Sequence, residues 1–597
     1  MALFAPSASP AVTVREIDLS GYAPNVTTST GAFVGNFVWG PVDDRTLVSD
    51  ESGLVSIFGK PDEDNAVDFL SAAYFLKYTD TLLVVRENSG GVNAHSALTQ
   101  LGDSANVNNL NHWENTVKSA VGEGASKTST GTWIAKYPGS LGNALSVSFC
   151  PAGDSASVDH FANWAYKNSF DVAPTTSDYA SDRGASNDEV HVAVIDRTGA
   201  FTGTAGSVLE TFPFLSMAKG AVTPDGSPNY ISDVINTQSE YIWNGYFGDD
   251  SAFGSDYLNL GGNIGTTPSV DSPVNYGIGV ALTDGVRTTS LGGGVNSGDL
   301  GTDEIALGFD QFEDVEQVTV DFLIAPQSSA LLTATTVVND LISIAQGRKD
   351  CVVVASPHRA GIVGESNADA TDNAVSFANS LTSSSYAVID NNYFKVYDKY
   401  NDKYVNIPAA SSTAGLMAAT DLVAAPWFSP AGQRRGNYLG VTDIVANPNK
   451  TQRDTLYKAN VNPIANIPGS GVILFGDKTM QRRPSAFDRI NVRRLFLALE
   501  RSIAIAAKGV MFEFNDEFTR AEFVNIVEPL LREVKGRRGI TDFRVVCDET
   551  NNTPDVVDRN EFVASIFIKP ARSINYVTLN FVAVRTGVEF DEVVGAV

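Results

Sequence analysis

The segment from residue 471 to residue 479 resembles a phosphate-binding loop. Gly471 and Gly476 enclose four residues, and Lys478 and Thr479 follow, but Asp477 separates the second glycine from the lysine. A phosphate-binding loop presents exposed backbone N–H groups just before a helix. Here the enclosed residues are Val, Ile, Leu and Phe, which is typical of a buried strand. We therefore expect a strand here and no nucleotide site.

A serine and a histidine, Ser356 and His358, follow an apolar run, where an α/β enzyme can carry catalytic groups. No G-x-S-x-G elbow surrounds the serine, and the chain has only 5 histidines. The acidic runs at 62–64 and 548–549 lack the spacing of a calcium-binding loop. We therefore expect a structural loop turned by Pro357, with no catalytic residue, no metal site and no cofactor.

Composition and charge are those of a folded, acidic protein. The chain has 597 residues, of which 43% are hydrophobic, and its formal net charge is −27. This length predicts several domains, and the charge argues against a nucleic-acid partner, because phosphate binding needs a positive surface. The segment 478–538 differs, since it has 13 Lys or Arg against 8 Asp or Glu. Such a cationic module suits an acidic protein partner.

The cysteines and the apolar segments indicate in which cellular compartment the protein is expected. The 3 cysteines, Cys150, Cys351 and Cys547, form no CxxC pair, so neither a disulfide framework nor a zinc site is expected. The chain has no run of about eighteen apolar residues, and its start lacks the pattern of a signal peptide. These features predict a soluble product of a reducing cytoplasm, without membrane insertion.

The elements that would position functional residues are clearest after residue 477. From Arg489 to Val510 apolar residues recur every three or four positions, which predicts a helix with one buried stripe that stops at Gly509. At about 100° per residue, cationic residues fall on the opposite side and form an outer face. The cationic residues proposed for this face are Arg489, Arg493, Arg494, Arg501 and Lys508.

A second helix and three strands are predicted downstream. The helix covers 522–535, and it either bends at Pro529 or begins there, since proline is tolerated in a first turn. Alternating or continuous apolar residues predict strands at 543–547, 563–568 and 577–583.

Each end of the chain carries one short apolar segment that needs a sheet edge. Val12, Val14 and Ile17 form a strand-like segment near the N-terminus, and Val588, Phe590 and Val593 form one near the C-terminus. Gly21 and Gly587 stand where a flexible joint is needed. Two such segments can pair with their own core or with neighbouring copies.

The remaining chain alternates between ordered and loop-rich parts. Strands are predicted at 32–39, 47–48, 81–86, 318–325, 351–355 and 386–389, helices at 66–77, 331–346 and 374–381, and a hairpin turned at 399–402. Between 88 and 310 the composition shifts to Gly, Ser, Asn, Asp and Thr with short strands, which is typical of inserted surface domains. The expected fold class is a multidomain α+β or mixed α/β protein with β-rich insertions.

Several stretches together resemble the tail sheath proteins of contractile bacteriophage tails. Near the N-terminus they are PAVTVREID (10–18), TGAFVGNFVWGP (30–41), SIFGKP (56–61) and FLKYTDTLLVVR (75–86). Further on they are DFLIAPQ (321–327), NIPAASSTAGLMAATD (406–421), APWFSPAG (425–432), VNPIANIPGSGVILFGDKTM (461–480), INVRRLFLALERSI (490–503) and the tail 566–594. No single motif is decisive, but their number and order are specific. The Pro-Gly usual near the first strand is Pro10-Ala11 here.

The resemblance implies a structural subunit with no active site. Such subunits stack as rings around a tail tube, are linked by exchanged terminal strands, and contract to drive the tube through a host envelope during genome delivery. It implies as partners further copies of the chain, the tail tube protein, and baseplate and tail terminator proteins, with no direct nucleic-acid contact. It places the protein in the virion tail sheath after assembly in the host cytoplasm.

The resemblance also implies a division into domains around a sheath core built from the N- and C-terminal parts. The predicted domains are an N-terminal arm (1–21), a first ordered part (22–96), an inserted outer domain (97–187), a return part (188–310), an α/β core (311–476), a tube-facing C-terminal domain (477–585) and a C-terminal arm (586–597).

Three alternatives remain open at the level of sequence. The nearest is the sheath of another contractile injection system, such as a bacteriocin particle or a secretion device. A secreted surface β-protein is suggested by the Gly-, Ser- and Asn-rich middle, although no signal peptide is apparent. An enzyme is the third class, and its candidate residues lack the required surroundings.

Overall fold

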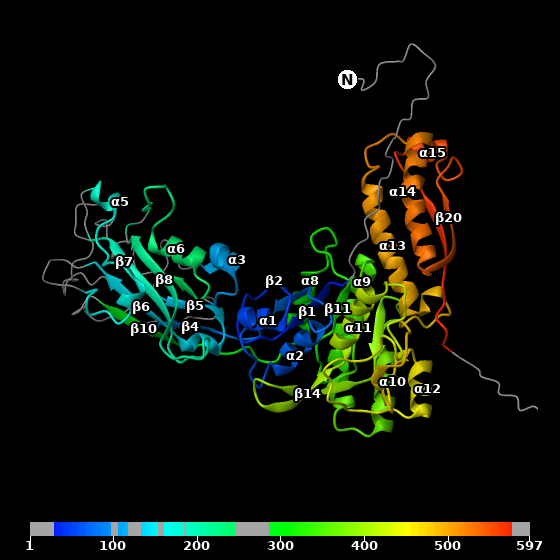
Figure 1. The fold of residues 1–597 in the computed structure, drawn as a ribbon, viewed down its shortest axis with the longest axis horizontal. Helices are drawn as coiled ribbons and strands as arrows, with labels where there is room; N and C mark the ends of the chain where they lie inside the picture. The colour runs from blue at the N-terminus through cyan, green and yellow to red at the C-terminus, as the bar shows by residue number, and fades with distance from the viewer. Residues whose placement is uncertain are drawn as a thin grey trace, which may run out of the picture. The chain divides into compact units, whose positions relative to one another are not determined.

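The structure is a computed structural model that describes residues 29–96, 106–117, 133–152, 160–183, 187–216, 218, 220–244 and 286–575 (Figure 1). Its contacts divide the chain into two compact units. The larger unit contains residues 27–424 and 430–490, and the smaller, C-terminal unit contains 425–429 and the chain from residue 491 onward. Among the described helices, none combines the length and apolar character needed to cross a membrane.

A seven-stranded sheet forms the core of the larger unit, in the order β17-β13-β12-β11-β1-β3-β2. All neighbouring strands run parallel except the edge strand β2, which is antiparallel to β3. Its central strands are apolar and buried, as expected when helices cover both faces. The strands are β1 (Gly31–Gly35), β2 (Arg45–Val48), β3 (Leu82–Arg86), β11 (Phe322–Ile324), β12 (Val352–Ala355), β13 (Ala387–Asp390) and β17 (Val461–Asn462).

Helices pack on this core sheet and confirm the predicted strand, helix, strand units. Helix α9 joins β11 to β12, and α10 joins β12 to β13. Ile305 and Phe309 of α8 are buried in the same core cluster as α9, so this helix belongs to the core. The helices are α1 (Glu51–Phe58), α2 (Ala66–Phe75), α8 (Thr302–Asp310), α9 (Leu331–Arg348), α10 (Asn367–Ser380), α11 (Ala410–Val423) and α12 (Lys450–Lys458), with short turns η5 (Arg359–Gly361) and η6 (Ala486–Asp488).

A second, antiparallel seven-stranded sheet forms an outer domain within the larger unit, in the order β8-β7-β6-β10-β4-β5-β9 (Figure 1). It takes strands from both sides of residues 187 and 188, so the predicted inserted and return parts share one sheet. The strands are β4 (Asn93–Ser96), β5 (Trp133–Pro138), β6 (Leu145–Pro151), β7 (Glu189–Asp196), β8 (Ser207–Ser216), β9 (Ile242–Asn244) and β10 (Arg287–Gly292). Short helices accompany them: α3 (Leu110–His112), η2 (Trp113–Val117), η3 (Ser140–Ala144), η4 (Lys167–Ser169), α5 (Asp178–Ser181) and α6 (Ile231–Gln238).

The segment that leaves the core for the outer domain and the segment that returns from it lie side by side. The N–H of Gly298 donates to the carbonyl of Ser89 at 2.9 Å, and Val92 and Val295 bridge just beyond. Trp39, from the loop after β1, packs edge-on against Tyr137 of the outer sheet, with ring centroids 5.4 Å apart. The outer domain is therefore an insertion that is anchored by side-chain packing as well as by its two connections.

Arg86, the last residue of β3, joins the core to the outer domain. Its guanidinium is fully buried and donates to the carbonyls of Phe37 at 2.9 Å, Gly40 at 2.7 Å and Pro138 at 2.6 Å. Pro138 belongs to β5, whereas Phe37 and Gly40 belong to the loop after β1. Burial lowers the pKa of Arg86 to about 9, because the charged form is removed from water.

Two small sheets complete the larger unit. The predicted hairpin is confirmed as β14 (Tyr393–Asp398) and β15 (Lys403–Pro408), whose chain turns at 399–402, and β16 (Asp443–Ile444) pairs with β14. The segment β18 (Ile464–Ile467) pairs antiparallel with β19 (Gly471–Leu474).

The C-terminal unit is a helical hairpin packed on a two-stranded sheet. Its elements are α13 (Ile490–Lys508), α14 (Glu517–Gly536), β20 (Ile540–Val546), α15 (Pro554–Asp558) and β21 (Ser565–Pro570). Asp516 caps α14 by accepting from the N–H of Thr519, so the helix begins well before Pro529 and contains it. The suggestion that the helix begins at Pro529 is therefore wrong. The third predicted strand, 577–583, lies outside the described residues.

Candidate functional site

The segment that resembles a phosphate-binding loop is a strand, as predicted. Residues 471–474 pair in register with 464–467, and Ile473 and Leu474 are buried. The Lys478 ammonium donates to the carbonyl of Tyr457 at 2.7 Å and to Asn460 Oδ1 at 3.2 Å. Its donors are thus used inside the protein, and the geometry offers no cradle for a phosphate.

The hydroxyl of Ser356, which with His358 follows β12, is engaged by other residues. Ser356 Oγ donates to Asp390 Oδ1 at 2.8 Å and accepts from the N–H of Ala410 at 2.9 Å. This second contact satisfies a backbone donor in the first turn of α11. The serine therefore joins the end of β13 to the start of α11, which is a structural role.

Asp390 is a buried carboxyl group, and its burial leads us to predict that the stability of the protein depends on pH. Burial raises its pKa to about 7, despite hydrogen bonds from Ser356, Thr413 and the N–H of Asn392. Between the unfolded pKa near 4 and the folded pKa near 7, only the folded state holds the proton. The free energy of unfolding should therefore fall by on the order of 4 kcal/mol as pH rises through this window.

Replacing Asp390 by Asn should remove this contribution, because the amide does not titrate. We expect the Asp390→Asn protein to lose less stability than the unaltered chain between pH 4 and pH 7, as measured by denaturant unfolding across that range. Asp402→Asn, at the tip of the β14–β15 hairpin, is the control and should keep the original slope. An unchanged slope in the Asp390 variant would show that the proton is not held there.

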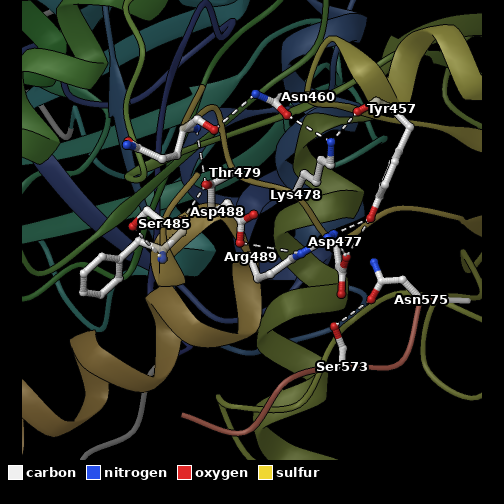
Figure 2. Close-up of polar contacts among 12 residues, drawn as sticks. Tyr457, Asn460, Asp477, Lys478, Thr479, Ser485, Asp488, Arg489, Ser573 and Asn575 are labelled. Carbon is white, nitrogen blue, oxygen red and sulfur yellow. Dashed lines mark hydrogen bonds and ion pairs between the residues drawn. The ribbon is translucent and has the colours of Figure 1, made fainter. Parts of the chain in front are cut away.

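A polar network holds the segment that leads into α13 (Figure 2). Arg489 Nη1 lies 3.0 Å from Asp477 Oδ1 and also donates to the hydroxyl of Tyr457, which in turn lies 3.3 Å from Asp477 Oδ1. The N–H of Ile490 donates to the carbonyl of Asp477 at 2.8 Å. Burial and then the Arg489 charge lower the pKa of the Lys478 ammonium. The first residue of α13 is therefore fixed to the segment after β19.

The predicted cationic outer face of α13 is wrong for its first two turns. Arg493 and Arg494 are only 6% and 4% exposed, and the Arg489 side chain is 24% exposed within the network. Arg501 is half-buried, and Lys508 is the only one of the five predicted residues that is exposed. A helical wheel gives the direction of each side chain but not what packs against it. The buried Leu497, which lies outside the apolar stripe, was the signal that this helix is covered on more than one side.

The sheet of the C-terminal unit has two strands and two outer edges. β20 and β21 pair antiparallel, with Arg544 opposite Phe567. Among the described residues no further strand pairs with either outer edge. Such edges present unpaired N–H and C=O groups that can accept an added strand. A two-stranded sheet is marginal alone, and this one is stabilised by packing on α14 through Ile540 and Phe543.

The residues predicted to link subunits lie outside the described residues. These are the N-terminal set Val12, Val14 and Ile17 with Gly21, and the C-terminal set Val588, Phe590 and Val593 with Gly587. Their roles remain predictions. What the structure contributes is the pair of sheet edges on which such segments could add.

Comparisons with known proteins agree over almost the whole chain. Residues 298–480 match a family described as the phage tail sheath protein central domain, and 482–583 match the phage tail sheath C-terminal domain. The chain is 33% identical to the tail sheath protein of Enterobacteria phage T4, covering 98% of this chain and 99% of that protein. It is 32% identical to the tail sheath protein of Vibrio phage KVP40, with the same coverage.

A solved structure supports the fold. A sheath tail protein from Listeria innocua aligns with a TM-score of 0.51 over 93% of this chain and 98% of that one, at 13% identity. The likeness confirms the multidomain α+β class that the sequence predicts.

Proposed function

The chain belongs to the phage tail sheath protein family and is a structural subunit of a contractile tail sheath; on this premise we propose how it assembles and acts. Subunits polymerise as stacked rings around a tail tube and contract to drive the tube through the host cell envelope during genome delivery. The observation that carries the proposal is the identity of about one third to phage tail sheath proteins along 98% of the chain.

The linkage between subunits is proposed to use the terminal arms. Residues 1–21 and 586–597 would each add a strand to the sheet of a neighbouring copy, with Gly21 and Gly587 as joints. The outer edges of the β20–β21 sheet support this, because among the described residues no further strand pairs with them. Each added backbone hydrogen bond contributes about 1 kcal/mol net, so a short strand with buried side chains can hold two copies together.

The partners are proposed to be further copies of the chain, the tail tube protein, and the baseplate and tail terminator proteins. Lys508, which is exposed, and Arg501, which is half-buried, are kept as tube-facing residues. Arg489, Arg493 and Arg494 are buried or half-buried and would orient the helix without touching a partner. Assembly would take place in the host cytoplasm and leave the protein in the virion.

Electron microscopy of the purified chain tests the proposal. We expect hollow, striated cylinders at raised protein concentration, or on added tail tubes, because ring stacking needs no component beyond the sheath subunit and its template. Dispersed particles under both conditions would contradict polymerisation as the function.

A further inference from the structure

The loop between α13 and α14 and the first turn of α14 expose a cluster of large apolar side chains. Phe512 is 101% exposed, Phe514 84%, Phe518 72% and Met511 59%. Phe512 also has a φ of 72°, in the left-handed region that disfavours residues with a side chain. Both the exposure and the backbone conformation are unfavourable, and no contact of Phe512 within the described chain offsets them. A surface of this kind indicates a binding site.

The end of the unit that carries this aromatic cluster is rich in acidic residues. Asn515 Nδ2 donates to the carbonyl of Glu561 at 2.8 Å and lies 3.3 Å from Asn552 Oδ1, which places the loop beside the segment around α15. We call the four apolar residues and the acids of this end the acidic tip. Its exposed acids are Glu513, Asp516, Glu517, Asp548, Glu549, Asp555, Asp558 and Glu561, of which Glu561 is paired with the exposed Arg559.

The opposite end of the same unit is basic. α14 has 20 residues, so its two ends lie about 30 Å apart. The N–H of Gly539 donates to the carbonyl of Val534, and the N–H of Ala571 donates to the carbonyl of Gly539 at 3.0 Å, which brings the end of β21 to the end of α14. We call this the basic end. Its exposed bases are Lys535, Arg537, Arg538, Lys569 and Arg572, of which Lys535 is paired with Asp542 and Arg537 with Glu533. The apolar Ile574 of this end is 84% exposed.

The helix dipole explains only part of this charge separation. Acids at the N-terminus and bases at the C-terminus of a helix are stabilising within the first and last turns, which accounts for Glu517 and Lys535. It does not account for Asp548 and Glu549 after β20, nor for Lys569 and Arg572 at the end of β21. The two ends therefore form complementary surfaces built from several elements.

Resting on the proposed function, we propose that the acidic tip of one copy docks on the basic end of the C-terminal unit of the next copy. The exposed phenylalanines would pack on the arginine side chains and on Ile574, since Arg and aromatic residues pair well at interfaces. Two different surfaces of one chain meeting head to tail give a ring or an open helical polymer, not a two-fold dimer. The contact is separate from the strand exchange proposed above, because it uses side chains of folded residues.

Charge reversal tests the contact. The tip variant carries Glu513→Lys, Glu549→Lys and Asp558→Lys, and the end variant carries Arg538→Glu, Lys569→Glu and Arg572→Glu. We expect each to raise the protein concentration needed for cylinder formation by at least about tenfold, through repulsion at every contact. The combined variant, with both sets, restores opposite charges and should assemble near the original concentration. A control with the same charge change on the outer domain, Asp171→Lys, Asp182→Lys and Asp233→Lys, should assemble normally.

A second variant separates docking from folding. Phe512→Gly removes an exposed ring and relieves the left-handed backbone, so its thermal unfolding midpoint should be unchanged or raised while assembly weakens. If the unaltered chain forms cylinders and the tip variant or Phe512→Gly forms them equally well, the docking proposal fails and the sheath function stands. Failure of the combined variant to recover would likewise overturn the pairing of these two surfaces. If the unaltered chain forms no cylinders, the proposed function fails and this contact fails with it.

Discussion

Deleting residues 586–597 is expected to give a folded, soluble protein that no longer forms cylinders. Among the described residues, the apolar core of the C-terminal unit is made by residues up to Ile568, so the deletion removes none of the core members that the structure describes. It does remove the segment proposed to add a strand to a neighbouring copy, and the hydrogen bonds and burial of that strand are lost at every linkage of the polymer. Size-exclusion chromatography and electron microscopy measure the outcome. Deleting residues 1–20 should have the same effect at the other arm.

Substitutions in the full-length chain show whether assembly depends on the pairing of this strand or only on the length of the chain. Replacing Val588 and Phe590, which share one face of a strand, by Asn should abolish assembly as the deletion does. Replacing Glu589 and Asp591 by their amides should not, because in a strand these residues point to the other face. Cylinders of normal stability from either truncated protein would rule out strand donation for that arm. An unfolded monomer would instead assign the strand to its own core.

Replacing Arg86 by Met is the point substitution with the largest expected effect on folding. The guanidinium is fully buried and serves three carbonyls in two domains, and methionine keeps much of the volume but none of the donors. Leaving buried carbonyls without their donors should lower the free energy of unfolding by about 3–5 kcal/mol. Tryptophan fluorescence during urea unfolding can follow this, since Trp39 and Trp133 lie in the core of the outer domain.

Arg197→Met is the matched control for the Arg86 substitution. The Arg197 guanidinium donates to one backbone carbonyl, that of Asn143 at 2.6 Å, and unlike Arg86 this residue is exposed. Its replacement should change stability by less than about 0.5 kcal/mol. Equal effects of the two substitutions would show that the buried contacts of Arg86 contribute little.

Local patterns in the sequence were sufficient to predict many single elements. The helices 331–348 and 490–508, the strands 82–86 and 352–355 and the hairpin at 393–408 follow from apolar periodicity and turn residues. Helix α1 was not predicted, because it is short and contains Gly53, and only its cap, Asp50, marks its start. The early start of α14 was missed for a related reason, since its first turn carries the exposed Phe518 instead of a buried stripe.

Long-range relations could not be read from single-residue patterns. The pairing of β1 with β11 joins segments separated by the whole outer domain. The burial of Arg86, Arg493 and Arg494 depends on what packs around them, and a charged residue by itself predicts exposure. The polar contacts among Tyr457, Asp477 and Arg489 likewise join residues whose spacing in the sequence suggests no relation.

The place of the insertion also sets the order in which the protein can fold during synthesis. β1 lies between β3 and β11, and the chain from Arg86 to Phe322 must be made before β11 exists. At about 5–20 residues per second this takes roughly 10–50 s. During that delay the edge of β1 that will pair with β11 has no partner, because β11 has not yet been synthesised. Such an unpaired strand edge favours premature pairing with other chains. Host chaperones acting on nascent chains should therefore affect the yield of this subunit most strongly in the interval between the synthesis of β3 and that of β11.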